Sequence, residues 1–331
     1  MSEADKGLYV VWRGYQRRAE LLGPLLNCRV CYLRSRWKSR WLRPIDYLLN
    51  GFATARLIRK HRPAFVVFQS PPPFAALAAL AQGVPYVVDA HNAAIQGWWA
   101  KLPTSRMVAR RALALVAHNQ EARDIARNAF TGTNIIRLRD PIIEMSQPEG
   151  DTKRRRDQVL IICSFGADEP LEAIHDLISL RPNLLFLITA PTHRLPPQWF
   201  ERFRSLSNLE LTGFLPTDRY QELLLTSGAA VVLTTREATQ PSGACEALAS
   251  DTPLVVSRSS LTENLFGRWA QVVPNDPKAL AAALDTALGA QRSLAGERSE
   301  WQAGFQHELL ALLTLLSPTP RGEEGINRNQ A

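Results

Sequence analysis

The stretch AFVVFQSPPPFAALAALAQGVPYVVDAHN, residues 64–92, decides the fold. No residue from Ala64 to Val88 is charged, which is long enough to cross a bilayer, but four prolines and a glycine interrupt the run. The pattern instead predicts a buried strand at 65–69, a helix at 74–82 and a second buried strand at 86–89. Apolar strands joined by a helix are typical of a parallel sheet that is covered on both faces.

The same alternation of apolar strands and helices continues on both sides of this stretch. It predicts an α/β chain with two Rossmann-like, doubly wound parallel-sheet domains. Such sheets bind ligands at the carboxyl ends of their strands, so the two domains are expected to face a ligand-binding cleft. The expected parts are a first domain at 1–143, a linker at 144–157, a second domain at 158–298, a C-terminal helix at 299–316 and a disordered tail at 317–331.

Composition and charge narrow the function classes. The 331 residues are 46% hydrophobic and 21% charged, which is typical of a globular protein and excludes collagen, coiled coils and long disorder. The net charge of +8 is concentrated at the start of the chain, because residues 1–62 contain 14 Lys and Arg but only 4 Asp and Glu. A basic segment of this kind is attracted to polyanions, whether nucleic acid, anionic lipid or a phosphorylated substrate.

The cysteines and the first residues predict a cytoplasmic protein. Cys28 and Cys31 have the spacing of half a zinc site, but Cys163 and Cys245 stand alone, so reduced thiols are expected. The chain begins with acidic residues where a secretory signal would carry basic residues and an apolar run. No Asp-x-Asp motif is present, so neither a metal nor a cofactor is expected.

The first candidate for chemistry is the segment from Asp89 to Asn92, which directly follows an uncharged strand. Polar groups at the carboxyl end of a parallel strand face the expected ligand site. His91 could take or hold a proton near neutral pH, and Asp89 could orient its ring. A structural role for His91, as a helix cap or a loop hydrogen-bond partner, is the alternative.

The second candidate is a loop that opens a helix near residues 239–249. Ser242 could cap this helix, Gly243 would allow a close backbone approach, and the free N–H groups of the first turn could hold a phosphate. Glu246 lies one turn further and could accept hydrogen bonds from vicinal hydroxyls such as those of a ribose. Alternatively, Glu246 only complements the helix dipole, which contributes roughly 0.3–1 kcal/mol.

Pro241-Ser242-Gly243, leading into Glu246 and residues 247–256, resembles the donor-binding segment of GT-B glycosyltransferases, especially the family 4 group. Asp89–Asn92 and Gln69–Pro73 are similar to the corresponding segments of the β-mannosyltransferases that build dolichol-linked oligosaccharide. Residues 211–215 also resemble the GT-B strand and loop before the donor site.

This resemblance implies a nucleotide-sugar donor that is held mainly by the second domain, with a membrane-bound, lipid-linked acceptor. The implied donor residues are Gly213 and Phe214 near the base, Glu246 at the ribose, and Ser242, Gly243 and Ala244 at the pyrophosphate, whose charge Arg236 could neutralise. The implied acceptor-side or phosphate residues are Gly14, Arg17 and Arg18, with His91 and Asp89 as the catalytic candidates.

Two departures from the family 4 pattern leave the stereochemistry open. The second acid expected eight residues before the ribose-binding Glu is Ala238 here, with Glu237 one place out of register. An Arg/Lys pair expected early in the second domain is replaced by Asp168 and Glu169. In an inverting reaction His91 or Asp89 would deprotonate the acceptor, whereas in a retaining reaction His91 would steady the donor sugar.

A third candidate is the basic and aromatic stretch that contains Arg36, Trp37, Lys38, Arg40 and Trp41. Such a stretch suits an anionic membrane surface. It is followed by apolar and further basic residues on a predicted helix at 42–61, and its alternative is an ordinary helix with a solvated basic face. Nucleic acid is not an expected partner, because no recognition motif accompanies the charge. Trp98 and Trp99 could form a sugar-binding or membrane-facing wall, or simply close the core.

The sequence therefore predicts a glycosyltransferase that moves a sugar from a nucleotide-diphosphate-sugar to a membrane-associated, lipid-linked acceptor in cell-surface glycan synthesis. It would be cytoplasmic and peripheral at the inner face of the cell membrane. Its competitors are a nucleotide-sugar epimerase of the same fold and a noncatalytic membrane-surface binding module. A nicotinamide oxidoreductase is disfavoured, because Gly14 alone follows the first strand instead of a G-x-G-x-x-G motif. The base, the sugar and the linkage stay open at this point.

Overall fold

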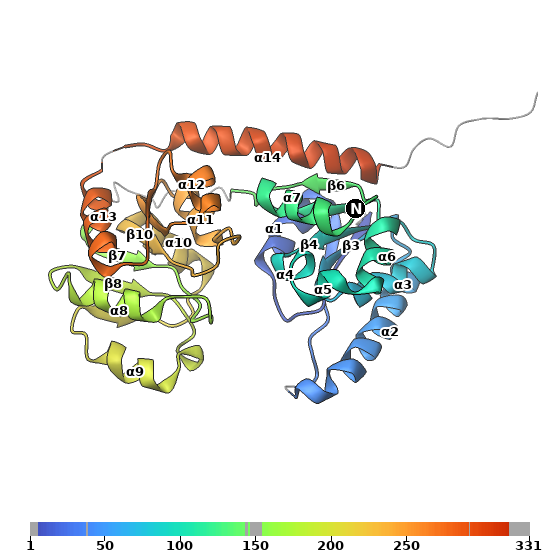
Figure 1. Cartoon of the computed structure of the whole chain (residues 1–331), viewed down its shortest axis with the longest axis horizontal. Helices are drawn as coiled ribbons and strands as arrows, with labels where there is room; N and C mark the ends of the chain where they lie inside the picture. The colour runs from blue at the N-terminus through green and yellow to red at the C-terminus, as the bar shows by residue number, and fades with distance from the viewer. Residues whose placement is uncertain (1–5, 38, 143–144, 146–153, 291, 318–331) are drawn as a thin grey trace, which may run out of the picture. The chain divides into compact units, whose positions relative to one another are not determined.

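The computed structural model describes residues 6–37, 39–142, 145, 154–290 and 292–317. These residues form two compact units. The first unit contains residues from 1–118, 125–138 and 306–331, and the second contains residues 119–124 and 139–305. Each unit has one parallel sheet, and Figure 1 labels the elements.

The first unit has a sheet of six strands in the order β2-β1-β3-β4-β5-β6. Every strand pairs in parallel with its neighbours, so the carboxyl ends of all strands meet at one edge. The strands are β1 Gly7–Val11, β2 Cys28–Tyr32, β3 Phe65–Ser70, β4 Tyr86–Ala90, β5 Ala114–Ala117 and β6 Ile135–Arg137. The helices are α1 Arg17–Leu25, η1 Arg40–Leu42, α2 Arg43–His61, η2 Pro73–Ala76, α3 Leu77–Ala81, α4 Asn92–Ile95, α5 Trp98–Lys101 and α6 Pro103–Arg111. Helix α7, Gln120–Ala129, is divided between the units, because its residues up to Asp124 belong to the second.

The second unit repeats this plan with the strand order β12-β11-β10-β7-β8-β9, again all parallel. The strands are β7 Arg155–Ile161, β8 Leu185–Ile188, β9 Leu209–Leu211, β10 Ser227–Val232, β11 Leu254–Ser257 and β12 Gln271–Val273. The helices are α8 Leu171–Ser179, η3 Thr192–Arg194, α9 Pro197–Arg204, α10 Thr217–Thr226, α11 Ser242–Ala249, α12 Ser260–Phe266, α13 Pro277–Gly289 and α14 Ala295–Leu316.

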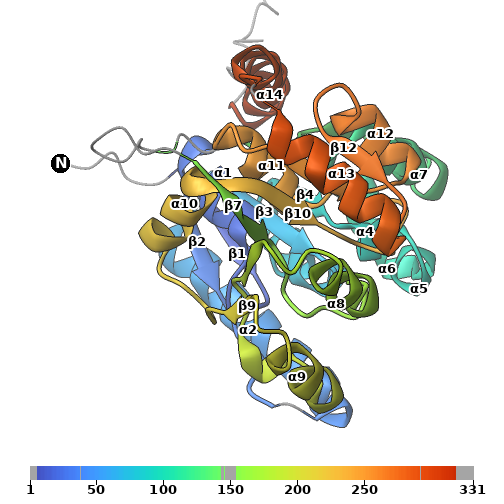
Figure 2. The ribbon, with the colours of Figure 1, turned by 90° about the vertical axis from the view of Figure 1, so that its left-hand side faces the viewer.

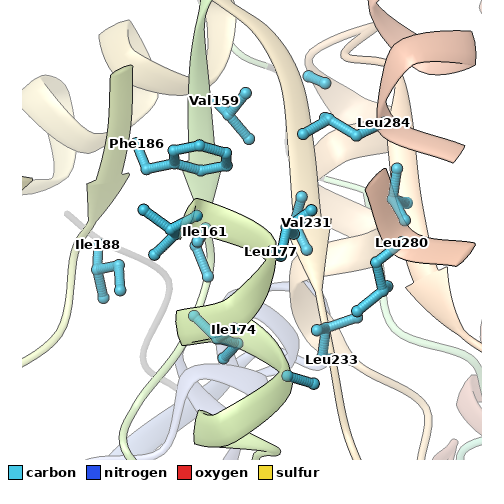
Figure 3. Packing of buried hydrophobic residues seen from close by; sticks show 14 of the residues in the cluster. Val159, Ile161, Ile174, Leu177, Phe186, Ile188, Val231, Leu233, Leu280 and Leu284 are labelled. Atoms are coloured by element: carbon cyan, nitrogen blue, oxygen red, sulfur yellow. The ribbon is translucent and has the colours of Figure 1, made fainter. Parts of the chain in front are cut away.

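The core of the second unit follows from the alternation of side chains along its strands. Val231 on β10 packs with α8 and α13 on one face, whereas Ala230 and Val232 pack with α11 on the other. Helices α8 and α13 contact each other and lie side by side in Figure 2. Figure 3 shows Ile174 and Leu177 of α8 among the strand residues and Leu280 of α13. Both faces of this sheet are therefore covered, as the uncharged strands β8, β10 and β11 predict.

The two Rossmann-like sheets confirm the predicted α/β fold class, with differences at some element boundaries. Strand β7 begins at Arg155, inside the segment expected to be a linker. The helix expected at 74–82 is a 3-10 turn followed by the short helix α3, because the prolines before it restrict its start. Helix α14 begins at Ala295, and its residues from Gln306 onward belong to the first unit, a return that the sequence pattern did not predict.

Some expectations fall on residues that the structure does not describe. Most of the expected linker, Lys38 and residues 318–331 lie outside the described residues. Within the described part of the chain, no helix has both the length and the apolar character that a membrane span requires.

Candidate functional site

In the first unit, His91 lies at the carboxyl edge of the sheet. It directly follows β4, its backbone N–H donates to the Ser70 carbonyl at the end of β3 (3.0 Å), and it occupies the N-cap position of α4. The His118 ring, which follows β5, has its centroid 6.3 Å from that of His91. The His91 side chain is 29% exposed, so it is held by the fold and still reachable by a ligand.

Asp89 is the buried anchor of this edge. Tyr9 donates its hydroxyl hydrogen to Asp89 Oδ2 (2.6 Å), and Arg18 donates from Nε to Oδ1 (3.1 Å). Burial by itself would raise the pKa of Asp89, but the Arg18 charge and the hydrogen bonds from His91 and Tyr9 hold it well below its ordinary value. The pKa of Tyr9 is raised by burial and by the Asp89 charge. Asp89 is therefore ionised, and its Oδ2 lies 3.5 Å from His91 Nε2.

Gln16 holds the other side of the His91 ring. Its Oε1 accepts a hydrogen bond from the Ala19 backbone N–H (2.6 Å) and caps α1, so its amide nitrogen is turned away from that helix. Gln16 Nε2 lies 3.3 Å from His91 Nε2. The same ring nitrogen thus faces a carboxylate and an amide, which together fix the orientation of the ring.

The three predicted acceptor-side residues lie in the loop and first turn after β1. Gly14 is exposed, and Arg17 is the first residue of α1. Arg18 is only 5% exposed and, besides Asp89, donates from Nη2 to the Leu138 carbonyl oxygen (2.7 Å). The structure therefore gives Arg18 partners inside the first unit, where it neutralises Asp89.

In the second unit, the predicted phosphate-binding turn opens α11. Pro241, not Ser242, is the N-cap residue, and no side chain caps this helix end. The expectation that Ser242 caps α11 is therefore wrong, because the proline already adopts the extended backbone that the cap position requires. Ser242, Gly243 and Ala244 form the first turn, and backbone N–H groups in such a turn can bind an anion.

Gly243 lets this turn approach the sheet. A Cβ atom at this position would lie 2.9 Å from Ile162 Cγ2 and 3.1 Å from Val232 Cγ2. Gly243→Ala should therefore displace the first turn and cost about 1–3 kcal/mol of stability. Thermal melts test this, and Gly289→Ala is the matched control, because nothing lies within 4 Å of a Cβ there. Equal melting temperatures of the two variants would contradict the packing role of Gly243.

Glu246 is the buried carboxylate of α11, with 7% exposure. Tyr220 on α10 donates its hydroxyl hydrogen to Glu246 Oε2. Glu246 lies on a helix whose other seven residues are, apart from Ser242, all buried. The Tyr220 hydroxyl thus fixes one oxygen of this carboxylate, a group that can accept several hydrogen bonds.

Arg236 follows β10 and is held by an acid that follows β7. Its Nε lies 3.8 Å from Asp168 Oδ2, and Thr234 donates its hydroxyl hydrogen to the same oxygen (3.2 Å). The Arg236 side chain remains 63% exposed. Glu169 organises the loop before it, accepting hydrogen bonds from the backbone N–H groups of Ser164 (2.9 Å) and Gly166 (2.7 Å). Of the two acids that replace the expected basic pair, Asp168 therefore binds the segment after β10, and Glu169 binds its own loop.

Two further features lie near the carboxyl ends of the second sheet. Gly213 has a positive φ of 73°, which lets the chain turn after β9, and the following Phe214 is 80% exposed. Gln240, which precedes the α11 cap, is buried, and its Oε1 has no hydrogen-bond partner among the described residues. An exposed aromatic ring and an unpaired amide oxygen both suit a ligand with a flat base and hydroxyl groups.

Sequence reasoning missed the residues that hold the predicted ones in place. Tyr220, Gln16 and Tyr9 come from segments 26 to 80 residues away from the side chains they contact. The position of His118 could have marked it as a site residue, because it directly follows β5, which pairs with the strand β4 before His91. Among the described residues, no group of three or more His, Cys, Asp or Glu side chains could hold a metal ion.

Comparison with known proteins gives a family match in the second unit. Residues 164–289 match the family model of glycosyl transferases group 1, which covers the loop after β7, α11 and most of the second unit. No curated protein sequence matches the chain.

Several solved structures share the fold at low sequence identity. Anabaena Alr3699/HepE in complex with UDP has a TM-score of 0.66 and 13% identity, covering 93% of this chain and 97% of its own. Sucrose-phosphate synthase from Thermosynechococcus elongatus has a TM-score of 0.70 and 15% identity, covering 94% and 98%. A mutant of S. aureus TarM, solved in complex with Fondaparinux, alpha-GlcNAc-glycerol and UDP, has a TM-score of 0.62 and 13% identity. The match covers 82% of this chain but only 59% of TarM. The chain therefore has the GT-B fold, and its second unit contains a domain that matches glycosyl transferases group 1.

Proposed function

We propose that the protein transfers a sugar from a UDP-sugar to a lipid-linked glycan acceptor at a membrane surface. The observation that carries the donor assignment is the side-chain-free start of α11 with the buried Glu246 one turn further along. The UDP found in the HepE and TarM structures supports uracil as the base.

Each part of the donor has a matching group in the second unit. The diphosphate would accept hydrogen bonds from the N–H groups of Ser242 and Gly243, assisted by the positive end of the helix dipole. The Ala244 N–H donates to the Pro241 carbonyl oxygen (3.1 Å), so Ala244 would line the turn without donating to the ligand. Glu246 would accept hydrogen bonds from the ribose hydroxyls, and the exposed Phe214 ring would contact the base. Arg236 would balance the charge of the leaving diphosphate.

The acceptor belongs to the first unit in this proposal. During transfer, an acceptor hydroxyl oxygen bonds to the sugar C1 as the bond from C1 to the diphosphate oxygen breaks, and the nucleoside diphosphate leaves with the bonding electrons. In an inverting reaction, the His91 ring takes the hydroxyl proton, and the ionised Asp89, whose Oδ2 lies 3.5 Å from His91 Nε2, stabilises the resulting imidazolium. In a retaining reaction, His91 binds the donor sugar instead. The anomeric configuration of the product, measured by NMR, distinguishes the two.

The membrane part of the proposal rests on the charge of the first unit. Residues 1–62 carry ten more basic than acidic residues, and exposed tryptophans such as Trp41 accompany them. The group of exposed positive and aromatic side chains fits an anionic membrane surface, where a lipid-linked acceptor for a cell-surface glycan would be presented.

A thermal-shift panel of UDP-, GDP- and dTDP-sugars tests the donor assignment. UDP-sugars should raise the melting temperature in a concentration-dependent way, because a ligand that binds only the folded state stabilises it by mass action. A panel in which no nucleotide changes the melting temperature would contradict the proposal. Conversion of a UDP-sugar to another UDP-sugar without added acceptor would identify an epimerase instead.

A further inference from the structure

Helix α2 turns its polar side chains inward. Asp46, Asn50 and Thr54 recur every four residues, so they share one face, and each is at most 3% exposed. The Arg36 backbone N–H donates to Asp46 Oδ1 (3.1 Å), and Arg36 Nη1 donates to Asn50 Oδ1 (2.9 Å). Thr54 Oγ1 accepts from Trp12 Nε1 (3.1 Å) and donates to the Asn50 carbonyl oxygen (2.7 Å). The buried side of α2 is thus held by hydrogen bonds.

The opposite side of α2 is apolar and exposed. Ile45 is 48% exposed, Leu48 65% and Phe52 71%, at helical spacing. Trp41, in the 3-10 turn that leads into α2, is 91% exposed. In Figures 1 and 2 the N-terminal half of α2 extends beyond its neighbours in the first unit. An ordinary amphipathic helix has the reverse arrangement, so this apolar face indicates a partner that is itself apolar.

An apolar groove continues this face toward α3 and α5. It has a volume of about 710 Å³, and aromatic rings form much of its wall. The centroids of Tyr47 and Phe74 are 5.6 Å apart, those of Phe74 and Trp99 5.9 Å, and Trp98 stacks on Trp99 at 3.9 Å. Trp98 is 59% exposed. Aromatic side chains with one apolar and one solvent-facing end are enriched at membrane interfaces.

The charges around this face identify the partner. Beyond Phe52 the helix continues with the exposed cations Arg56, Arg59 and Lys60, and Arg43 is exposed at its start. The apolar face is therefore bounded along the helix by positive charge, with no exposed acid on α2 among its described residues. Anionic headgroups complement these cations, while hydrocarbon complements the apolar face.

We propose that the apolar face of α2 and its groove insert into the outer layer of an anionic lipid bilayer, with a lipid hydrocarbon chain in the groove. The inference rests on the proposed function for its membrane setting, but the binding itself needs neither donor nor acceptor. It assigns the contact to α2 rather than to the preceding stretch, because Arg36 is engaged by Asp46 and Asn50. The cations at the surface are then Arg43, Arg56, Arg59 and Lys60.

Vesicle co-sedimentation of the full chain tests this, using phosphatidylcholine vesicles with and without phosphatidylglycerol. The wild-type protein should sediment with the anionic vesicles, and added salt should reduce the bound fraction. The double variant Leu48→Ser, Phe52→Ser should lower the partition coefficient by at least about tenfold, because both side chains leave the hydrocarbon. Leu310→Ser on α14 is the matched control, since Leu310 is 64% exposed and outside the groove, and it should bind as wild type does.

Other outcomes would overturn the inference. Equal partition of the double variant and the wild type would exclude α2 as the contact, and absence of wild-type binding to either vesicle would exclude the bilayer. A wild-type dimer in sedimentation velocity that the double variant dissociates, without vesicle binding, would assign the face to a second copy of the chain. Thermal shift with UDP-sugars is measured on the same variants, so a failed membrane contact is distinguishable from a failed donor assignment.

Discussion

Glu246→Gln should lower the affinity for UDP by at least about 30-fold while the protein stays folded. Hydrogen bonds to a charged group contribute about 1.5–3 kcal/mol each, and the two ribose hydroxyls would lose their charged acceptor. The amide has the size of the carboxylate, and its oxygen can still accept the hydrogen bond from Tyr220 that the structure shows. Isothermal titration of UDP into both proteins measures the difference.

Two further variants make this result specific to the donor site. Glu263→Gln on α12 removes an acid whose partner is Arg258 at 3.3 Å and should leave UDP affinity unchanged. Tyr220→Phe keeps the carboxylate but removes the hydroxyl that orients it, so a smaller loss of affinity is expected than for Glu246→Gln. Unchanged UDP affinity in a folded Glu246→Gln protein would remove Glu246 from the donor site.

Asp89→Asn should destabilise the first unit by about 3–5 kcal/mol. Both members of the ion pair with Arg18 are 5% exposed, and removing one partner leaves the other charge buried without compensation. Urea denaturation followed by circular dichroism measures the loss in the full chain. The exposed pair of Asp285 and Arg181 is the control, because Asp285→Asn should cost less than about 1 kcal/mol.

The effect of Asp89 has a defined pH dependence. The pKa of Asp89 in the folded state lies well below its ordinary value of 3.8, so the unfolded chain takes up a proton first as the pH falls. The stabilisation is therefore complete above pH 3.8 and is lost progressively below it. The stability difference between wild type and Asp89→Asn should shrink as the pH falls below 3.8. A difference that stays unchanged in that acid range would contradict the role of the Asp89 charge.

Much of the fold could be predicted from local pattern. Apolar runs such as 65–70 and 86–90 are central strands, and an uncharged run between turn residues has few other stable forms in a globular unit. The orientation of α2 could not be predicted in this way. The alternative of an ordinary helix on the sheet would bury Leu48 and Phe52, but Asp46 and Asn50 take the inner side because Arg36, ten to fourteen residues earlier, hydrogen-bonds to both.

In the candidate site, too, features set by neighbouring residues could be predicted, whereas contacts between distant residues could not. The turn at Ser242 and Gly243 and the acid at Glu246 could be predicted, because a helix start and its first acid are adjacent in sequence. Their partner Tyr220 and the Arg18 that pairs with Asp89 could not, since the sheet topology brings them together from 26 and 71 residues away. The role of Asp168 is likewise visible only once the loops after β7 and β10 are placed side by side.

In the proposed function, the first turn of α11 and Glu246 hold the nucleotide diphosphate of the donor. Hydrogen exchange of the full chain, measured by mass spectrometry with and without UDP, locates that contact directly. With UDP, exchange should be slower in peptides that cover residues 211–220 and 236–249, and the exchange of sheet strands far from α11 should be unchanged. Protection confined to other segments, at UDP concentrations that stabilise the protein, would contradict it.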